Sequence, residues 1–283
     1  MTSLERWREA RRLDQPIAPL LMGVVNVTPD SFFDGGEFAS HDAALSRALQ
    51  LVEEGADYID IGGESTRPGA KVVSVTEELQ RVLPVIEGLR QRSDVAISID
   101  TSRVEVMDAA CAAGACLIND VRALQSTGAY DVAIHHDVDV CLMHMRGAPA
   151  TMQSEPHYDD VGSEVQSFLS QRRDACVAAG IQATRILVDP GIGFGKLLEH
   201  NLALLRALPD WSRNGQQVVL GVSRKSMLGE ISVQPSVRRL YGGLAVAYHA
   251  AVAGVTVLRV HDVAATRETL QVWSAIHGVV RTE

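Results

Sequence analysis

Side chains suited to ligand binding or catalysis follow most of the short apolar runs in this chain. They are Asn26, Asp60, Asp100, Asn119, Met143 with His144, Asp189, Ser223 with Lys225, and Arg259 with His261. If the runs are parallel strands, their carboxyl ends meet at one face, which is where a barrel carries its active site. Helix capping is the expectation for Asp60, Asp120 and Asp262. It does not account for the whole set, because Arg and Lys are poor helix N-caps.

Three of the loops after these runs are long or rich in glycine, as binding and lid loops often are. They span residues 26–36, 62–69 and 189–196. The third loop ends in Gly195-Lys196, but Leu197 follows where a P-loop has Ser or Thr. Its glycines alternate instead of following the spacing of a dinucleotide-binding motif. The third loop therefore predicts no nucleotide site.

The apolar runs alternate with segments of helical period, which predicts an α/β protein. The expected strands span 20–25, 58–61, 96–99, 116–118, 138–143, 185–188, 217–221 and 256–260. The expected helices span 42–54, 75–92, 104–113, 129–135, 160–179, 200–207, 236–253 and 263–276. Eight such units can close into a (β/α)8 TIM barrel, with a doubly wound open sheet as the alternative.

One domain fits the length of 283 residues, since barrels of about 250 residues form single domains. The barrel is expected over about 19–278, with residues 1–18 as an N-terminal extension. The net charge of −9 predicts no nucleic-acid partner and no binding to an anionic membrane. The longest apolar stretch, Leu244–Val260, is interrupted by His249 and Gly254, so no membrane span is expected.

Cysteine and histidine provide no metal-binding pattern outside the strand ends. The four cysteines form no C-x-x-C motif and indicate reduced thiols and a cytoplasmic location. They are Cys111, Cys116, Cys141 and Cys176. The remaining histidines lack ligand spacing, and the first residues lack the apolar core of a signal peptide.

Eight motifs in chain order resemble the dihydropteroate synthase family, from about Leu21 to His277. They are Asn26-Val-Thr-Pro-Asp-Ser-Phe, Gly62-Gly-Glu-Ser-Thr-Arg-Pro-Gly, Ser98-Ile-Asp-Thr-Ser, Ile118-Asn-Asp, Leu142-Met-His-Met, Asp189-Pro-Gly-Ile-Gly-Phe-Gly-Lys, Gly221-Val-Ser-Arg-Lys-Ser and Arg259-Val-His-Asp. Each motif stands at an expected strand end, which makes the resemblance specific. Phe33 departs from the pattern, because many members have a small polar residue there.

The resemblance implies a step of folate synthesis. The expected substrates are 6-hydroxymethyl-7,8-dihydropterin pyrophosphate and p-aminobenzoate, joined to give 7,8-dihydropteroate with release of pyrophosphate. It further implies a Mg²⁺ requirement and a homodimer. One alternative is a pterin-barrel methyltransferase acting on methyltetrahydrofolate, in which no Ser-Thr-Arg-Pro loop or Ser-Arg-Lys motif is expected. The other is an inactive pterin-binding paralogue, in which Asn26, Asp100, Lys225 or Arg259 should be missing.

The resemblance implies a pterin site with a carboxylate, an amide, two cations and apolar walls. Its residues are Asp100, Asn119, Met143, Asp189, Phe194, Gly221, Lys225 and Arg259. A pterin edge presents a ring N–H and an amino group, which the single carboxylate of Asp189 can accept. Asn119 and Lys225 suit the remaining polar ring atoms. Met143 and Phe194 can wall the flat ring.

Pyrophosphate must be neutralised before it leaves, and the residues expected to hold it are Asn26, Thr66, Arg67, Arg259 and His261. Asn26 is the expected Mg²⁺ ligand, because its amide oxygen is a hard donor. Arg259 can stack on the pterin and reach the phosphate. Asp100 can stabilise positive charge on the reacting methylene, which favours an ionising, SN1-like path. Direct participants would be Asn26, Asp100, Lys225, Arg259 and His261.

The p-aminobenzoate is expected under the first two loops, against Phe32, Thr66, Arg67, Pro68 and Ser223. These loops contain few large apolar residues to anchor them, so we predict that they close only over bound pyrophosphate. The affinity for p-aminobenzoate should then be low for the free protein and rise when pyrophosphate and Mg²⁺ are added. Calorimetric titration with and without those ligands measures the difference. Equal affinities would mean that the pocket is preformed.

Overall fold

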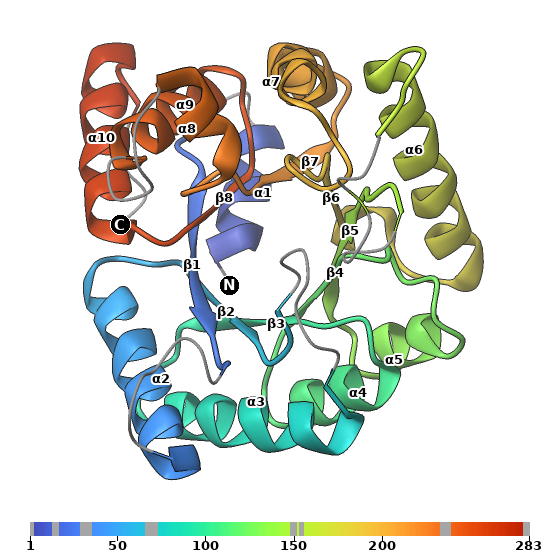
Figure 1. Ribbon diagram of the computed structural model, residues 1–283, viewed down its shortest axis with the longest axis vertical. Helices are drawn as coiled ribbons and strands as arrows, with labels where there is room; N and C mark the ends of the chain where they lie inside the picture. Colours follow the sequence, from blue (N-terminus) through green and yellow to red (C-terminus); the bar gives the residue numbers. More distant parts are fainter. Residues whose placement is uncertain are drawn as a thin grey trace.

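The computed structural model describes residues 3–12, 17–28, 36–65, 73–147, 152, 156–232 and 239–279. Within them, eight parallel strands close into a barrel in chain order (Figure 1). The strands are β1 (Leu20–Asn26), β2 (Tyr58–Gly62), β3 (Ala96–Asp100), β4 (Leu117–Asp120), β5 (Asp139–Met143), β6 (Ile186–Asp189), β7 (Gln217–Leu220) and β8 (Val257–Val260). The expected (β/α)8 barrel is confirmed, and the open-sheet alternative is wrong.

Helices surround the barrel on its outside (Figure 1). They are α1 (Ser3–Arg12), α2 (Gly36–Glu53), α3 (Val75–Arg90), α4 (Val104–Ala112), α5 (Ala129–His135), α6 (Val161–Ala179), α7 (Leu198–Arg213), α8 (Ser226–Ser232), α9 (Leu240–Val252) and α10 (Val263–His277), with a 3-10 turn η2 (Ala183–Arg185). All eight expected helices are present. The sequence did not predict α1, α8 or η2, and α2 begins before the expected residue.

Helix α7 continues to Arg213, whereas the sequence predicted an end at residue 207. Pro209 lies inside the helix and cannot donate to the carbonyl oxygen of Leu205. His249 of α9 contacts that oxygen through Nε2 at 2.9 Å. The neighbouring helix thus replaces the hydrogen bond that proline removes, which is why the helix passes through it.

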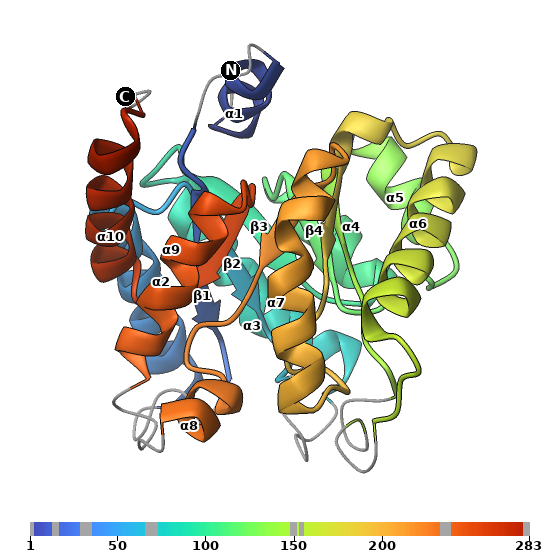
Figure 2. The same ribbon diagram turned by 90° about the horizontal axis from the view of Figure 1, so that it is seen from above.

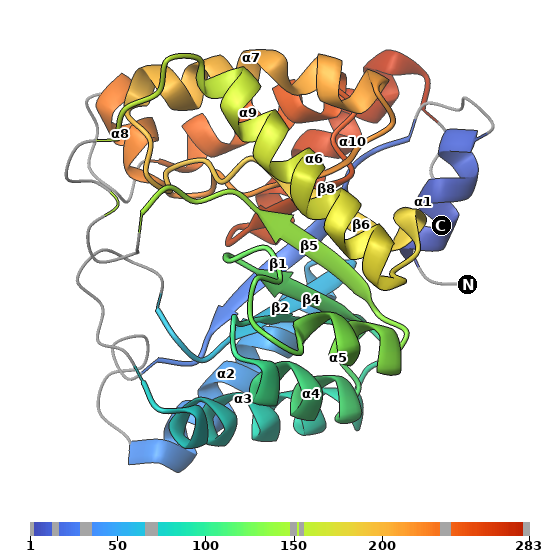
Figure 3. The same cartoon turned by 90° about the vertical axis from the view of Figure 1, so that its right-hand side faces the viewer.

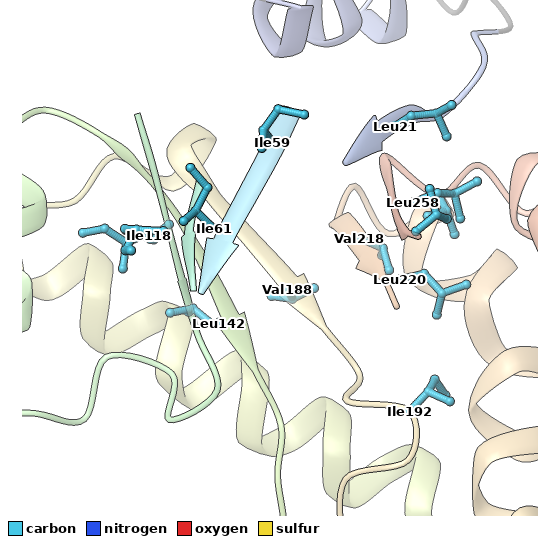
Figure 4. Packing of buried hydrophobic residues seen from close by; sticks show 14 of the residues in the cluster. Leu21, Ile59, Ile61, Ile118, Leu142, Val188, Ile192, Val218, Leu220 and Leu258 are labelled. Atoms are coloured by element: carbon cyan, nitrogen blue, oxygen red, sulfur yellow. The ribbon is translucent and has the colours of Figure 1, made fainter. Parts of the chain in front are cut away.

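Side chains on each strand alternate between the helices and the barrel interior. Outward residues pack against the helices, as Figure 4 shows for Ile59, Ile61, Ile118, Leu142, Val188 and Leu220. A second buried cluster comes from the alternate positions and fills the interior: Leu20, Met22, Tyr58, Leu117, Cys141, Leu187, Val219 and Val257. Because the period of a strand is two residues, the next inward positions lie two residues closer to the carboxyl ends of the strands.

Helix α1 closes the amino-terminal end of the barrel. Leu4 and Trp7 belong to the interior cluster, and Arg8 donates to Gln217 Oε1 at 2.8 Å and to Asp139 Oδ1 at 3.1 Å. Figures 2 and 3 show α1 at one end of the molecule and α8 at the other. The open mouth is therefore the carboxyl-terminal one.

Two expectations about the whole chain can be compared with the structure. All four cysteines are free thiols, and three of them are buried. Among the described residues, the helices are too short or too polar to cross a bilayer.

We predict that α1 contributes to stability mainly through the ring of Trp7, which is 4 % exposed. Trp7→Ala should lower the free energy of unfolding by about 3–5 kcal/mol. Trp7→Phe should change it far less, because it keeps a ring and removes a buried Nε1–H that bonds to no described residue. Denaturant titration of both variants measures this. Similar losses for Ala and Phe would contradict the role of ring packing.

Candidate active site

Polar residues occupy the inward positions nearest the carboxyl ends of the strands. Parallel pairing sets Asn26 beside Gly62, Gly62 beside Asp100, and Asp100 beside Asn119. On the far side of the barrel, Met143 pairs with Asp189. The structure thus brings together side chains from strands that lie far apart in the sequence, as the barrel geometry predicted.

The guanidinium of Arg259 bridges the mouth of the barrel. Its Nε donates to Asp60 Oδ2 at 2.6 Å, and its Nη2 donates to Asp100 Oδ2 at 2.7 Å. Burial by itself lowers the pKa of Arg259. The carboxylates of Asp60 and Asp100 raise it by a larger amount, so the net shift is upward. The side chain is therefore a permanent cation. Its Nη1 donates to no described residue, so protons remain for a ligand.

Asp60 belongs to this site, and the expectation that it caps a helix is wrong. Its side chain is fully buried. Besides Arg259, its Oδ2 accepts from Asn119 Nδ2 at 3.2 Å, while Oδ1 has no partner among the described residues. Position 60 shares the inward face with Tyr58, so the side chain cannot turn back over a helix. No signal in the sequence marks this face, because the neighbours on both faces of the strand are apolar.

Asp120 and Asp262 lie outside the inward set. Asp120 holds the turn after β4 by accepting from the backbone N–H groups of Arg122 and Leu124, each at 2.8 Å. Asp262 stands at the N-cap position of α10, but its carboxylate makes no capping bond. It pairs instead with Arg224, whose Nε lies 3.0 Å from Oδ2. Capping by these two side chains is therefore not the arrangement found.

Two carboxyl groups of the site are buried, which disfavours their negatively charged forms. Burial raises the pKa of Asp100 to about 7, although Arg259 opposes the shift. Burial also raises the pKa of Asp189, and Lys225 opposes it. Asp189 Oδ1 accepts from the backbone N–H of Gly191 at 2.7 Å. Each carboxylate oxygen has two lone pairs, so Asp189 keeps acceptor capacity for a bound donor pair.

A cationic and aromatic wall stands beside these acids. Lys225 Nζ lies 4.7 Å from the centre of the Phe194 ring and donates to the carbonyl oxygen of Ile192. Burial lowers the pKa of Lys225 to about 8, while Asp189 opposes this shift. A Cβ at Gly221 would lie 3.8 Å from both Arg259 Cδ and Lys225 Nζ. Gly221 therefore lies beside both cations, where a side chain would be in van der Waals contact with each of them.

Some of the remaining expected residues lie in the described part of the chain, and others lie outside it. His261 Nδ1 lies 3.2 Å from Ser223 Oγ, which also accepts from the backbone N–H of His261. Asn26 is half-buried at the end of β1, and Met143 is buried at the end of β5. Phe32, Thr66, Arg67 and Pro68 are outside the described residues.

Comparison with known proteins gives one consistent family. The profile described as pterin binding enzyme matches residues 22–261. A dihydropteroate synthase of Haemophilus influenzae is 48% identical over 257 residues, which are 91% of this chain and 94% of that protein.

Solved structures agree with the sequence match. The Xanthomonas albilineans dihydropteroate synthase with 4-aminobenzoic acid has a TM-score of 0.87 at 50% identity and covers 93% of this chain and 94% of its own. The same enzyme in complex with 7,8-dihydropteroate gives 0.84 at 46% identity, covering 93% and 95%.

The raised pKa of Asp100 predicts a pH-dependent loss of stability. Between 3.8 and about 7 the folded protein keeps a proton that the unfolded chain releases, so the free energy of unfolding falls as pH rises through this range. Asp100→Asn lacks this titration. We expect the variant to gain stability relative to the unchanged protein between about pH 5 and about pH 8. Denaturant titration at both pH values measures it, and a constant difference would refute it.

Proposed function

This chain belongs to the dihydropteroate synthase family of pterin-binding enzymes, and we propose that it joins 6-hydroxymethyl-7,8-dihydropterin pyrophosphate to p-aminobenzoate. The products are 7,8-dihydropteroate and pyrophosphate. The observation that carries this proposal is the mouth of the barrel, where the acids Asp60, Asp100 and Asp189 meet the cations Arg259 and Lys225. A flat heterocycle with donors on one edge and acceptors on another complements such a site.

The pterin half of the reaction is assigned to the far side of the mouth. Asp189 accepts the ring N–H and the amino group, and Asn119 binds further ring atoms. Lys225 donates to acceptor atoms of the ring, which Met143 and Phe194 border. The contact of Lys225 with Phe194 supports this arrangement, since it holds the ammonium at the edge of the opening.

The pyrophosphate half is assigned to Asn26, Arg259 and His261, together with Thr66 and Arg67. The fit of Mg²⁺ can be judged from the donors present: Asn26 offers an amide oxygen, and the described residues contain no group of three or more His, Cys, Asp or Glu that could hold a metal. A single protein oxygen suits Mg²⁺, which is usually bound by one or two side chains plus phosphates and water. When bound, Mg²⁺ would neutralise the leaving pyrophosphate.

The electrostatics favour ionisation before attack. The bond from the methylene carbon to the pyrophosphate oxygen breaks, and Arg259 stabilises the departing anion with its remaining protons. Asp100, held 2.7 Å from the same guanidinium, is assigned to stabilise the cation left on the dihydropterin. The arylamine nitrogen then bonds to the methylene and releases a proton. Asp60 accepts from Nε of the same guanidinium and helps to fix its position.

The p-aminobenzoate is assigned to the side of the mouth that holds Ser223, together with Phe32, Thr66, Arg67 and Pro68. The Ser223 hydroxyl, already close to His261, supports this location as a donor for the carboxylate.

We further propose a cytoplasmic homodimer. Exposed apolar side chains on two adjacent helices, Val252 of α9 and Val272 and Ile276 of α10, support a partner surface there. The free cysteines are compatible with a reducing compartment.

The activity is tested with the purified full chain, dihydropterin pyrophosphate, p-aminobenzoate and Mg²⁺, with dihydropteroate measured as product. Formation of dihydropteroate supports the proposal. Tight pterin binding without turnover would instead identify an inactive paralogue. Methyl transfer from methyltetrahydrofolate would favour the methyltransferase alternative.

A matched pair of variants separates the two halves of the site. Asp189→Asn should weaken binding of a pterin without phosphates by about 1–3 kcal/mol, because an amide cannot accept two donors on one edge and leaves one unpaired. Asn26→Ala should spare that pterin but raise the Mg²⁺ concentration needed for turnover and weaken pyrophosphate binding. Calorimetry with each ligand measures both. If either variant lost both ligands equally, its assignment to one half would be wrong.

A further inference from the structure

A buried lysine lies behind the pterin half of the mouth, and its Nζ forms no hydrogen bond to a carboxylate of the described residues. Lys196 is 3 % exposed, and its Nζ lies 2.9 Å from the carbonyl oxygen of Gly191 and 3.0 Å from that of Phe194. The same Nζ lies 2.9 Å from His144 Nδ1, with the carbonyl oxygen of His144 further away at 3.4 Å. Burial, together with the charge of Lys196, lowers the pKa of His144 to about 3, so its neutral ring can accept a hydrogen bond.

The loop between β6 and α7 is pressed closely against the segment after β5. A Cβ at Gly191 would lie 1.8 Å from the carbonyl oxygen of His144, and one at Gly195 would lie 2.3 Å from that of Arg146. Both glycines have positive φ, +68° and +62°. Backbone bent in this way turns carbonyl oxygens into the gap, where each needs a donor. Lys196 supplies donors to two of these loop carbonyls, those of Gly191 and Phe194.

Asn201 of α7 completes the same framework. Its Oδ1 accepts from the backbone N–H of Gly193 at 2.8 Å, and its Nδ2 donates to the carbonyl oxygen of Leu197 at 2.9 Å. The backbone on both sides of Phe194 is therefore held in place by Lys196, at the end of the loop, and by Asn201 of α7. Phe194 in turn lies under Lys225, and Asp189 begins the loop.

The choice of residue also points to a specific role. Only three of the 26 basic residues in the chain are lysines, at positions 71, 196 and 225. An ammonium directs three protons to converging acceptors, whereas the flat guanidinium of Arg directs its five protons outward in one plane. Burial lowers the pKa of Lys196 to about 7, which is the cost of placing this compact donor there.

We propose that Lys196 is a positioning residue for pterin recognition: its ammonium ties the carbonyls of Gly191 and Phe194 to His144, so that Asp189 and Phe194 hold their binding geometry before substrate arrives. The inference rests on the proposed function and adds to it a residue that need not contact the substrate. It belongs to the pterin half alone. Loss of Lys196 should therefore weaken pterin binding and leave pyrophosphate binding unchanged.

Lys196→Met tests this, because it keeps the length of the side chain and removes the donors. Arg90→Met is the matched control. Arg90 donates to the carbonyl oxygens of Ser93 and Val95 just before β3, at the opposite end of the barrel. Calorimetry would measure the affinity of each variant for a dihydropterin without phosphates and for pyrophosphate with Mg²⁺. Steady-state kinetics would give the KM for each substrate.

We expect Lys196→Met to weaken dihydropterin binding at least tenfold, to raise the KM for dihydropterin pyrophosphate, and to leave pyrophosphate affinity and the KM for p-aminobenzoate within twofold. Arg90→Met should change none of these. Unchanged dihydropterin affinity in Lys196→Met, or equal losses for both ligands, would overturn the inference. If the unchanged protein binds no pterin at all, the proposed function fails instead.

A second measurement needs no substitution at Lys196 and keeps the proposal testable if that variant does not fold. Protein labelled with [15N]lysine has three Nζ signals, which Lys71→Arg and Lys225→Met variants assign by elimination. The Lys196 Nζ protons should exchange slowly with water in the free protein and equally slowly with dihydropterin bound. Rapid exchange in the free protein would mean that the loop is not held in advance, and would overturn the inference.

Discussion

The strict alternation of side chains along eight parallel strands is the constraint on which both the core and the site depend. In a closed barrel every second residue faces the interior, whatever its chemistry. Most inward positions near α1 are apolar and pack as a core, as Leu20, Tyr58 and Val257 do, while the polar Asp139 and Gln217 bind Arg8 of α1. Two residues further along β2 and β8, the same face carries Asp60 and Arg259. The step from core to site is therefore a single period of the strand.

Burying the charged groups of the site lowers the stability of the folded protein. The same burial leaves these groups ready to bind a ligand that restores their interactions. Three carboxylates and two cations meet at the mouth. The pKa values of Asp100 and Asp189 are raised and that of Lys225 is lowered, so the neutral form of all three groups is favoured. Only Arg259 is stabilised as an ion, because two acids share it. A substrate that supplies donors to one acid and an anion to the free protons of Arg259 offsets this cost, so binding energy is concentrated where charge develops.

The fold could be predicted because its strands are short β-branched runs with glycine between them and the preceding helices. Most strand bounds agree with the prediction within one or two residues. What could not be predicted depends on contacts across the molecule. The sequence predicted an end of α7 at residue 207, before Pro209, and only packing against α9 supplies His249 to the carbonyl oxygen of Leu205 that proline leaves without its donor. Helix α1 is rich in arginine, and only the interior of the barrel explains why Trp7 is buried.

Part of the site was predictable for the same reason, and part was not. Residues at strand ends were placed correctly, because carboxyl ends of parallel strands must meet. Asp60 was expected to cap a helix. Its neighbours Tyr58, Ile59 and Ile61 are all apolar, so the sequence does not reveal which face of β2 is the inner one.

The three cations near the mouth have different roles, which follow from the shapes of their side chains. Arg259 spans the gap between acids on two strands, which a planar fork with separated donors can do and a point charge cannot. Lys196 and Lys225 instead donate to carbonyl oxygens of a tightly bent loop, where a guanidinium would be too wide. Arginine bridges two separated carboxylates, and lysine donates to neighbouring backbone carbonyl groups. Exchanging the two at either place would therefore disturb geometry more than charge.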